Sequence, residues 1–333
     1  MGGGYSFPMV TLPRERVVVV TGANRGLGYE TTKWIAMLGA TVILACRSAE
    51  NGRMAIDTIN KEYEEEKKKG TPGLCDYDKL SMDVMELDLA SLASTRKFIN
   101  DYRDSGRPLH VLICNAGVAM CPPEITEDGY ELHFQANYLG HFLLCAELLP
   151  LMEANGQDCR IVLVSSFMHL NSGFDSKRIQ GIYPYTLYNR IIHYSNSKLY
   201  QIMQTYTMKR LLQNSNVSIC CVNPGWVYTD IVRGLGDYGT LMYWSYSIVA
   251  WTGFKTMYQG ATVSINAAVS PDKPEAPYYT NNRVGYHSRT SRNKDHQKHL
   301  WTYTLECLKP FMESETWNRL ASFNMGGENG NDN

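Results

Sequence analysis

The sequence lacks several features that mark other classes of protein. Its 32 Lys and Arg residues are matched by 33 Asp and Glu residues, which gives a formal net charge of −1. Nucleic-acid binders need an excess of basic residues to neutralise phosphates, so we expect no nucleic-acid partner. We also find no internal repeat, no linker that would divide the chain, and no secretory signal peptide before the first predicted strand.

The cysteine pattern provides neither a disulfide framework nor a metal site. Nine cysteines are scattered along the chain, their number is odd, and no CxxC pair occurs. This pattern is typical of a reducing compartment with free thiols, so we expect a cytoplasmic protein without a bound metal.

What the sequence does contain is an alternation of short β-branched runs with longer helical segments. The 333 residues are 44% hydrophobic, which suffices for a large core. The patterns predict strands at 16–21, 41–45, 84–90, 109–117, 160–166, 218–225 and 278–280. They predict helices at 27–38, 49–69, 92–102, 129–154, 189–214, 256–269 and 291–309. Such alternation indicates an α/β protein whose parallel sheet is covered on both faces. We expect a leader at 1–15, one domain at 16–310 and a disordered tail at 326–333.

A glycine-rich turn follows the first predicted strand directly. The stretch TGANRGLG (21–28) lies between a β-branched strand and a helix, with Gly22, Gly26 and Gly28 at a TGxxxGxG spacing. Glycines at this place let the backbone turn tightly and approach a pyrophosphate at a helix N-terminus. The sequence therefore predicts a dinucleotide-binding loop.

The end of the second predicted strand favours NADP(H) over NAD(H). An acidic residue there would bind a ribose 2′-hydroxyl, whereas an arginine accommodates a 2′-phosphate. This chain has Arg47, with no acidic side chain before Glu50, and Arg25 adds a second positive charge in the glycine loop. The alternative is that Arg47 is an ordinary surface arginine.

The stretch YSNSK (194–198) places a tyrosine one helical turn before a lysine. On a helix, residues four apart share a face. A cation about 4 Å from a phenol, at an effective dielectric of about 20, would stabilise its ionised form by roughly 4 kcal/mol. That corresponds to about three pKa units, enough to make Tyr194 an acid–base group near neutrality. Alone, the pair could also be an exposed helix face.

Taken together, these motifs resemble the short-chain dehydrogenases/reductases over about residues 16–309. The resemblance adds LDLAS (87–91), CNAG (114–117), NYLGHFLL (137–144), VLVSS (162–166) and NPGWVYTD (223–230) to the two stretches above. Cys114 departs from the asparagine usual in the family. The chain is most similar to the retinol-dehydrogenase-like and X-linked dehydrogenase/reductase branches. The resemblance implies a Rossmann-type, doubly wound, three-layer α/β/α fold and allows a homodimer through the two long helices.

The resemblance also implies a role for each matching residue. Asn137 would hold a water of the proton relay, Ser166 would orient the substrate carbonyl, and Tyr194 would be the acid–base group. Lys198 would bind the nicotinamide ribose and lower the pKa of Tyr194. Ser166 could instead cap a strand end, and Asn137 could be a buried helix residue. The expected cofactor-binding set is Gly22, Asn24, Arg25, Gly26, Leu27, Gly28, Arg47, Asp88, Asn115, Ala116, Gly117, Tyr194, Lys198, Pro224, Gly225 and Thr229.

The nature of the substrate is inferred from an uncharged aromatic segment at 238–254. It belongs to an expected substrate lid at 226–258 and is too short and polar for a good transmembrane span. Three roles of this segment fit the sequence: a lid over an apolar ligand, a contact with a membrane surface, or part of the ordinary core. Gly2 and Ser6 match an N-myristoylation signal, although a flexible glycine-rich leader would look the same. We expect a lipophilic carbonyl or alcohol of the retinoid, steroid, polyprenol or lipid-aldehyde type, with possible peripheral membrane contact.

Two other functions fit the same residues. The first is the same chemistry run mainly in the direction of alcohol oxidation. The second is a catalytically silent NADP-binding sensor or scaffold. The presence of both Tyr194 and Lys198 favours an enzyme.

Overall fold

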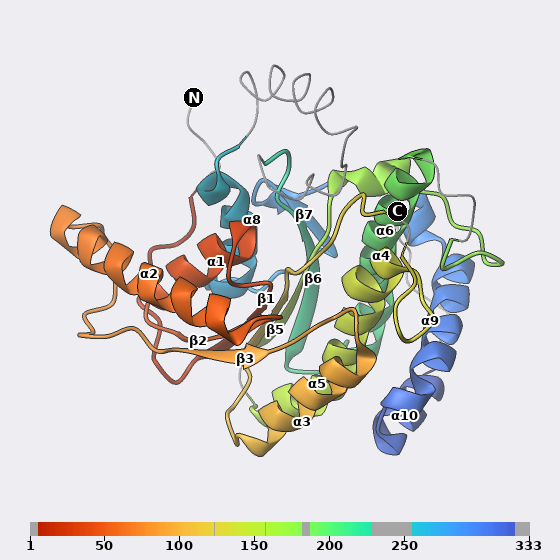
Figure 1. Ribbon diagram of the computed structural model, residues 1–333, viewed down its shortest axis with the longest axis horizontal. Coiled ribbons are helices and arrows are strands. Elements are labelled where there is room, and N and C mark those ends of the chain that lie inside the picture. The colour runs from red at the N-terminus through yellow and green to blue at the C-terminus, as the bar shows by residue number, and fades with distance from the viewer. Residues whose placement is uncertain (1–5, 123, 157, 182–186, 228–254, 324–333) are drawn as a thin grey trace.

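The computed structural model describes residues 6–122, 124–156, 158–181, 187–227 and 255–323 (Figure 1). Its strands form one sheet in the order β3-β2-β1-β4-β5-β6-β7-β8. They are β1 (Val17–Thr21), β2 (Thr41–Cys46), β3 (Met82–Glu86), β4 (Val111–Cys114), β5 (Cys159–Val164), β6 (Val217–Asn223), β7 (Tyr278–Thr280) and β8 (Arg283–Val284). All neighbours pair in parallel except β7 and β8. This order is that of a Rossmann-type doubly wound sheet, as the sequence predicted.

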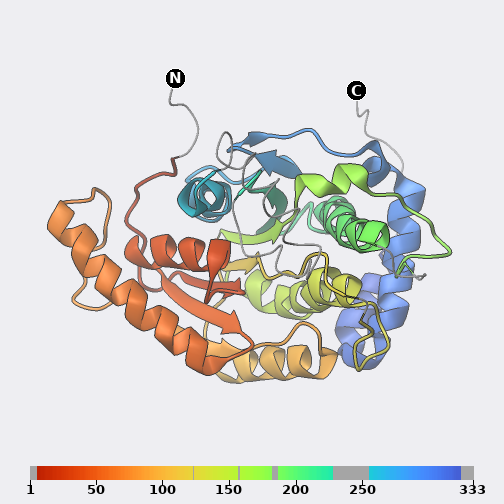
Figure 2. The ribbon, with the colours of Figure 1, turned by 45° about the horizontal axis from the view of Figure 1, so that its top comes forward.

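Helices cover both faces of the sheet (Figures 1 and 2). The first layer holds α1 (Gly26–Met37), α2 (Ala49–Lys69) and α8 (Met257–Val269). The second holds α3 (Leu92–Asp104), α5 (Gly140–Ala154), α6 (Leu187–Leu211), α9 (Lys294–Leu308) and α10 (Ser314–Ala321). The three-layer α/β/α arrangement is therefore confirmed. None of the helices in the described ranges is both long and apolar enough to cross a membrane.

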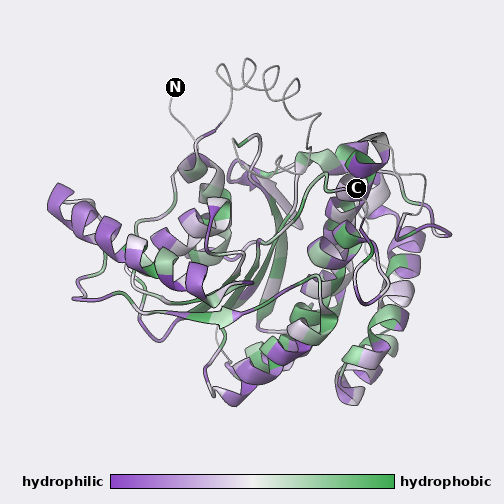
Figure 3. Cartoon of the chain, in the orientation of Figure 1, coloured by the Kyte–Doolittle hydropathy of each residue, from purple (hydrophilic) through white to green (hydrophobic). Residues whose placement is uncertain are grey.

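The alternation of side chains along β1 explains why two cores form. Val17 and Val19 pack into the core beneath the second layer, whereas Val18 and Val20 pack into the core beneath the first. Successive strand residues point to opposite faces, so an all-apolar strand needs helices on both sides. Figure 3 shows the hydrophobic strands inside and a hydrophilic end on α2, where most of the charged residues at 61–69 are exposed or half-buried.

Near the N-terminus the structure differs from the sequence-based expectation. The segment 1–15 was expected to be a flexible leader, but Phe7 and Leu12 are buried in the core of the first layer. The Phe7 ring lies 5.6 Å from Trp34 and 5.8 Å from Tyr258, centroid to centroid. Within the described residues the chain therefore joins the core before residue 16, because aromatic packing outweighs the low structural propensity of the segment.

Two further boundaries were wrong. The predicted helix at 129–154 is interrupted: a short helix, α4 (Leu132–Phe134), leads into a π-helical turn at Gln135–Leu139 before α5 begins. The domain was expected to end at 310, but α10 follows, and the Leu320 carbonyl at its end accepts a hydrogen bond from Trp301 Nε1 at 3.2 Å. The expected tail at 326–333 lies outside the described residues.

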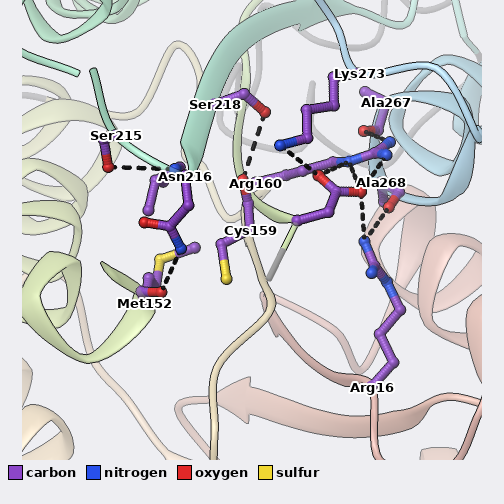
Figure 4. A network of polar contacts seen from close by, with 12 residues as sticks. Arg16, Met152, Cys159, Arg160, Ser215, Asn216, Ser218, Ala267, Ala268 and Lys273 are labelled. Carbon is purple, nitrogen blue, oxygen red and sulfur yellow. Dashed lines mark hydrogen bonds and ion pairs between the residues drawn. The ribbon is translucent and has the colours of Figure 1, made fainter. Parts of the chain in front are cut away.

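A network of ion pairs and hydrogen bonds connects the sheet to α8 at the edge opposite the carboxyl ends of the strands (Figure 4). Arg160 is buried, and its guanidinium donates to Asp158 Oδ2 at 2.5 Å and to the Ala267 carbonyl at 3.2 Å. Arg16 and Lys273 lie 3.6 and 3.7 Å from the same carboxylate. The network connects the starts of β1 and β5 to α8. It therefore stabilises the amino edge of the sheet and lies away from the carboxyl edge.

Candidate active site

The glycine loop lies between β1 and β4, where the strand order reverses. A Cβ on Gly28 would lie 2.2 Å from the Gly22 carbonyl oxygen and 2.5 Å from Asn115 Nδ2, so the close packing excludes any side chain. Thr21 Oγ1 accepts hydrogen bonds at 2.9 Å from the backbone N–H groups of Asn115 and Ala116. The turn after β4 is thereby fixed against the loop after β1, at the crevice where such sheets bind ligands.

Gly26 has a different reason to be glycine. Its φ is +57°, and a Cβ there would meet no atom within 4 Å. The residue opens α1, whose first N–H groups have no partner within the helix. The open space at Gly26 and the helix N-terminus together fit the diphosphate of a dinucleotide. Asn24, Arg25 and Leu27 lie in the same turn, and the Arg25 side chain is exposed.

The residues expected to hold the adenosine half follow β2 and β3, the next two strands of the sheet after β1. Arg47 follows β2 directly and is exposed, within the first turn after the strand. Asp88 lies beyond β3, and its Oδ1 accepts the Ala90 N–H at 3.0 Å. Both residues follow strands whose carboxyl ends lie at the same edge of the sheet as the glycine loop.

Asn137 lies inside the π-helical turn, where it is fully buried. Its side-chain amide bridges the Val118 backbone, accepting the N–H at 2.8 Å and donating to the carbonyl at 2.9 Å. Its carbonyl oxygen accepts from Gln201 Nε2 at 2.9 Å. Single π-helical turns frequently occur at functional sites, because they re-aim one backbone carbonyl. Here the turn directs the Asn137 carbonyl at α6.

Ser166, Tyr194 and Lys198 meet where the end of β5 faces α6. Ser166 follows the strand by two residues, and its hydroxyl is close enough to Tyr194 to lower the pKa of the phenol. Tyr194 and Lys198 are 6% and 3% exposed, and the Lys198 ammonium lies 5.8 Å from the centroid of the Tyr194 ring. A Cβ added to Gly117 would lie 3.6 Å from Lys198 Nζ, so the turn after β4 lies beside the ammonium. The sequence motif thus forms a buried cluster and not an exposed helix face.

The electrostatics of this cluster differ from the sequence-based expectation. Burial raises the pKa of Tyr194 to about 12, although the Ser166 hydroxyl lowers it in part. Burial also lowers the pKa of Lys198 to about 8. The predicted lowering of the tyrosine pKa by the lysine is therefore wrong for this geometry. The Lys198 Nζ is not at the phenol oxygen: it donates to the Val164 carbonyl at 2.8 Å and to Gln201 Oε1 at 3.3 Å.

A stability prediction follows from the buried ammonium of Lys198. The folded protein releases the Lys198 proton near pH 8, whereas the unfolded chain keeps it to about 10.5. The unfolded state binds more protons between these values, so wild-type stability should rise with pH in that window, by roughly 3 kcal/mol in total. We compare the unfolding free energy of Lys198→Met with that of wild type. The variant should exceed wild type by most below pH 8, and the difference should shrink as the pH rises from 8 to 10.5. Urea unfolding at several pH values checks this; an advantage independent of pH contradicts it.

The turn after β6 lies where the sequence predicted contacts with the nicotinamide end of the cofactor. Pro224 is buried, and its carbonyl accepts from Lys255 Nζ at 2.6 Å. A Cβ on Gly225 would lie 2.7 Å from the same Nζ. Thr229 and most of the expected lid, including 238–254, lie outside the described residues. The flanks of that segment do meet, since Val227 and Lys255 form a parallel bridge.

Sequence reasoning missed three polar residues that hold this cluster in place. Gln201 links the Asn137 carbonyl to the Lys198 ammonium, and Ser197 Oγ accepts from Asn137 Nδ2 at 2.9 Å. Lys255 holds the turn after β6. The spacing of Lys198 and Gln201, three residues apart on one helix, could have indicated the first link. His169 is buried beside the cluster, with Nδ1 2.6 Å from the Ser166 carbonyl oxygen, and its ring packs on Tyr278.

Comparison with known proteins agrees with this geometry. Residues 16–238 match the family model described as short chain dehydrogenase. Human polyprenol dehydrogenase is 33% identical over 315 residues, covering 91% of this chain and 88% of that protein. Human retinol dehydrogenase 11 is 34% identical over 310 residues, covering 92% and 90%. A solved structure of an uncharacterised protein from Mycobacterium paratuberculosis superposes with a TM-score of 0.67 at 27% identity, covering 88% of this chain and 93% of that one.

Proposed function

Since the chain belongs to the short chain dehydrogenase family and is an oxidoreductase, we propose that it reduces a lipophilic carbonyl compound with NADPH. One observation carries the proposal: the Ser166, Tyr194 and Lys198 side chains cluster at the carboxyl edge of the sheet, beside an open glycine loop. The cofactor would be held by Gly26, Arg47 and the other residues predicted from the sequence. When bound, it supplies the hydride.

The side chains of the cluster provide the proton. A pKa of about 12 keeps the Tyr194 phenol protonated at neutral pH, so it can donate to the oxygen of a substrate as negative charge develops there. Ser166 reaches the same phenol and can hydrogen-bond the same oxygen. The ammonium of Lys198, the Gln201 amide and the Asn137 carbonyl form a chain of hydrogen bonds that fixes the lysine one helical turn from the phenol.

Support for a lipophilic substrate comes from the edge of the same site. Phe167 follows Ser166, and its ring centroid lies 3.9 Å from that of Trp226, which is 53% exposed beside Gly225. An exposed aromatic surface next to the reacting groups suits an apolar chain. The names of the similar human proteins, polyprenol dehydrogenase and retinol dehydrogenase 11, point to substrates of this kind for those proteins. Myristoylation, peripheral membrane contact, a cytoplasmic location and a homodimer stay predictions.

The proposal is tested by following NADPH or NADH consumption with a panel of carbonyl compounds. We expect conjugated lipophilic aldehydes to turn over faster than small polar ones, and NADPH to be preferred by about tenfold in kcat/KM, because an arginine–phosphate contact contributes on the order of 1.5–3 kcal/mol.

Arg47→Ala should reduce that preference, while Arg53→Ala, an exposed arginine of α2, should leave it unchanged. A preference for NADH would refute the cofactor assignment, and turnover restricted to small polar carbonyls would refute the substrate class. Tight NADPH binding without turnover of any compound would instead support the silent sensor or scaffold.

A further inference from the structure

His141 is a fully buried histidine between the end of β1 and the π-helical turn. It lies in the first turn of α5, four residues after Asn137 in the stretch NYLGHFLL. A polar atom without a partner in the core is costly, so a buried histidine needs a partner at each ring nitrogen. The two partners of His141 belong to two different parts of the candidate active site.

The contacts of the His141 ring define its tautomer. Nδ1 lies 3.1 Å from the backbone carbonyl oxygen of Asn137, and Nε2 lies 2.9 Å from Thr21 Oγ1. A carbonyl oxygen only accepts, so Nδ1 carries the ring proton and donates it. Burial lowers the pKa of His141 to about 4, so the ring is neutral near pH 7 and Nε2 is the acceptor. Only this neutral tautomer fits both contacts.

The Thr21 hydroxyl connects His141 to the end of β1, directly before the glycine loop. Its single proton goes to His141, because the other acceptor, the Ile113 carbonyl, is more distant at 3.4 Å. Its oxygen accepts the N–H groups of Asn115 and Ala116, each at 2.9 Å. The proton and both lone pairs of this hydroxyl are therefore used, and its orientation is fixed.

The Asn137 carbonyl connects His141 to the lysine of the cluster. It accepts the Nδ1 proton of His141 and also a proton of Gln201 Nε2, at 2.9 Å. Gln201 Oε1 in turn accepts from Lys198 Nζ at 3.3 Å. A single chain of hydrogen bonds therefore runs from Thr21, beside the glycine loop, to the Lys198 ammonium.

The position of the Gln201 amide decides where the Lys198 ammonium points. An ammonium has three N–H donors. One of them goes to the Val164 carbonyl at 2.8 Å and another to Gln201 Oε1 at 3.3 Å. Because the nitrogen is tetrahedral, these two contacts fix the direction of the third N–H. If the Gln201 amide turned away, the ammonium could rotate while it kept its bond to Val164.

We propose that His141 is a positioning residue for carbonyl reduction. By holding the Asn137 carbonyl it orients the Gln201 amide, and through this amide the Lys198 ammonium, relative to the loop after β1. His141 acts through these groups, so no bond forms or breaks at its ring. The effect on turnover rests on the proposed function, whereas the effect on the position of the ammonium does not.

His141→Leu and His141→Asn in the full chain form a matched pair for the test. The two side chains have nearly the same shape and are too short to reach Thr21, so both variants should lose similar stability and bind NADPH similarly. Asparagine keeps an N–H donor at the position of Nδ1, whereas leucine has none. We expect kcat for reduction of a lipophilic aldehyde to fall about 10- to 100-fold in His141→Leu and by less than about threefold in His141→Asn, because small misplacements of reacting groups are this costly.

Tyr138→Phe is the control for a purely structural effect. Tyr138 follows Asn137 in the same π-helical turn and is buried, and its hydroxyl lies 2.8 Å from Thr304 Oγ1 of α9. The variant loses a buried hydrogen bond of this turn and leaves the chain to Lys198 unchanged. We expect a lower Tm and the wild-type kcat.

Titration of the Lys198 ammonium tests the proposal without turnover. Burial lowers the pKa of Lys198 to about 8, and the NMR signal of its ¹³C-labelled Cε, identified by its loss in Lys198→Met, follows this titration. Since Gln201 Oε1 stabilises the charged form, the pKa should be lower in His141→Leu than in wild type, and His141→Asn should match wild type. The other titratable groups that act on this ammonium are unchanged in both variants: Cys114 and Cys221.

Three results would overturn the proposal: equal kcat in His141→Leu and His141→Asn, an equal loss of kcat in Tyr138→Phe, or the same Lys198 pKa in His141→Leu and wild type. If wild type reduces no carbonyl, the proposed function fails, and the lysine titration alone decides on His141. Should His141→Leu fail to fold, His141→Gln takes its place, because glutamine reaches Thr21 but has no donor at the position of Nδ1.

Discussion

Tyr194→Phe is expected to lose carbonyl reduction by roughly 10²–10⁴-fold while it still binds NADPH. The substitution removes one oxygen atom, the one that Ser166 reaches and that would give its proton to the substrate. The phenyl ring can still pack against His133, so the fold should persist. Cofactor binding should persist because the glycine loop and the residue after β2 are unchanged. Steady-state NADPH consumption measures the loss, and fluorescence titration measures the binding.

Tyr200→Phe is the matched control for this variant. Tyr200 lies in the same helix, is buried, and donates its hydroxyl to the Ile179 carbonyl at 2.8 Å. It therefore loses a buried hydroxyl without loss of the proposed proton donor. We expect some loss of stability, about 1 kcal/mol, and near wild-type turnover. Equal turnover in Tyr194→Phe and Tyr200→Phe would refute the role of Tyr194.

Gly26→Ala is expected to weaken NADPH binding by about a hundredfold. The added methyl group meets no protein atom within 4 Å, so it would project into the space that fits the diphosphate. Loss of one or two hydrogen bonds from the helix N-terminus to a charged group is worth roughly 1.5–3 kcal/mol each. Isothermal titration with NADPH measures the affinity, and thermal unfolding without cofactor measures the stability.

The backbone of Gly26 also introduces a strain that must be separated from the loss of contacts. Gly26 and Gly106 have φ values of +57° and +65°, and neither position has an atom within 4 Å of an added Cβ. Gly106→Ala therefore carries the same conformational cost of about 1 kcal/mol, at a position after α3 and away from the glycine loop. We expect similar stabilities for the two variants and wild-type affinity for Gly106→Ala. Wild-type affinity in Gly26→Ala would show that the cofactor does not approach this turn.

Much of the fold was predictable because the apolar runs are short, continuous and regularly spaced. The first strand, with four valines in succession, must be buried on both faces, and the structure confirms this. The helix at Ala49–Lys69 has the predicted bounds, because Ser48 caps its start and Gly70, at φ +70°, ends it. These signals are local, so they can be read without knowledge of the neighbours.

Other features depend on contacts between distant segments. Phe7 is buried because Trp34 and Tyr258 enclose it, and nothing in the first fifteen residues predicts that. The strand β8 has two exposed residues, Arg283 and Val284, and is defined by its pairing with β7. A strand of this length has no periodicity to recognise.

In the candidate site, too, some features could be predicted from local sequence and others depend on contacts between distant segments. The motifs placed Ser166, Tyr194 and Lys198 correctly at one edge of the sheet, since the carboxyl ends of parallel strands meet there. The pKa of Tyr194 was predicted wrongly, because burial depends on how α6 packs and not on the spacing of two residues.

The most direct test of the central claim is a single turnover with NADPH that carries deuterium at both hydrogen positions of C4 of the nicotinamide. Wild type should convert a conjugated lipophilic aldehyde into an alcohol with deuterium on its carbinol carbon, while Tyr194→Phe, saturated with the same cofactor, should form almost none. Alcohol without deuterium, or equal rates of formation in the two proteins, would contradict the account.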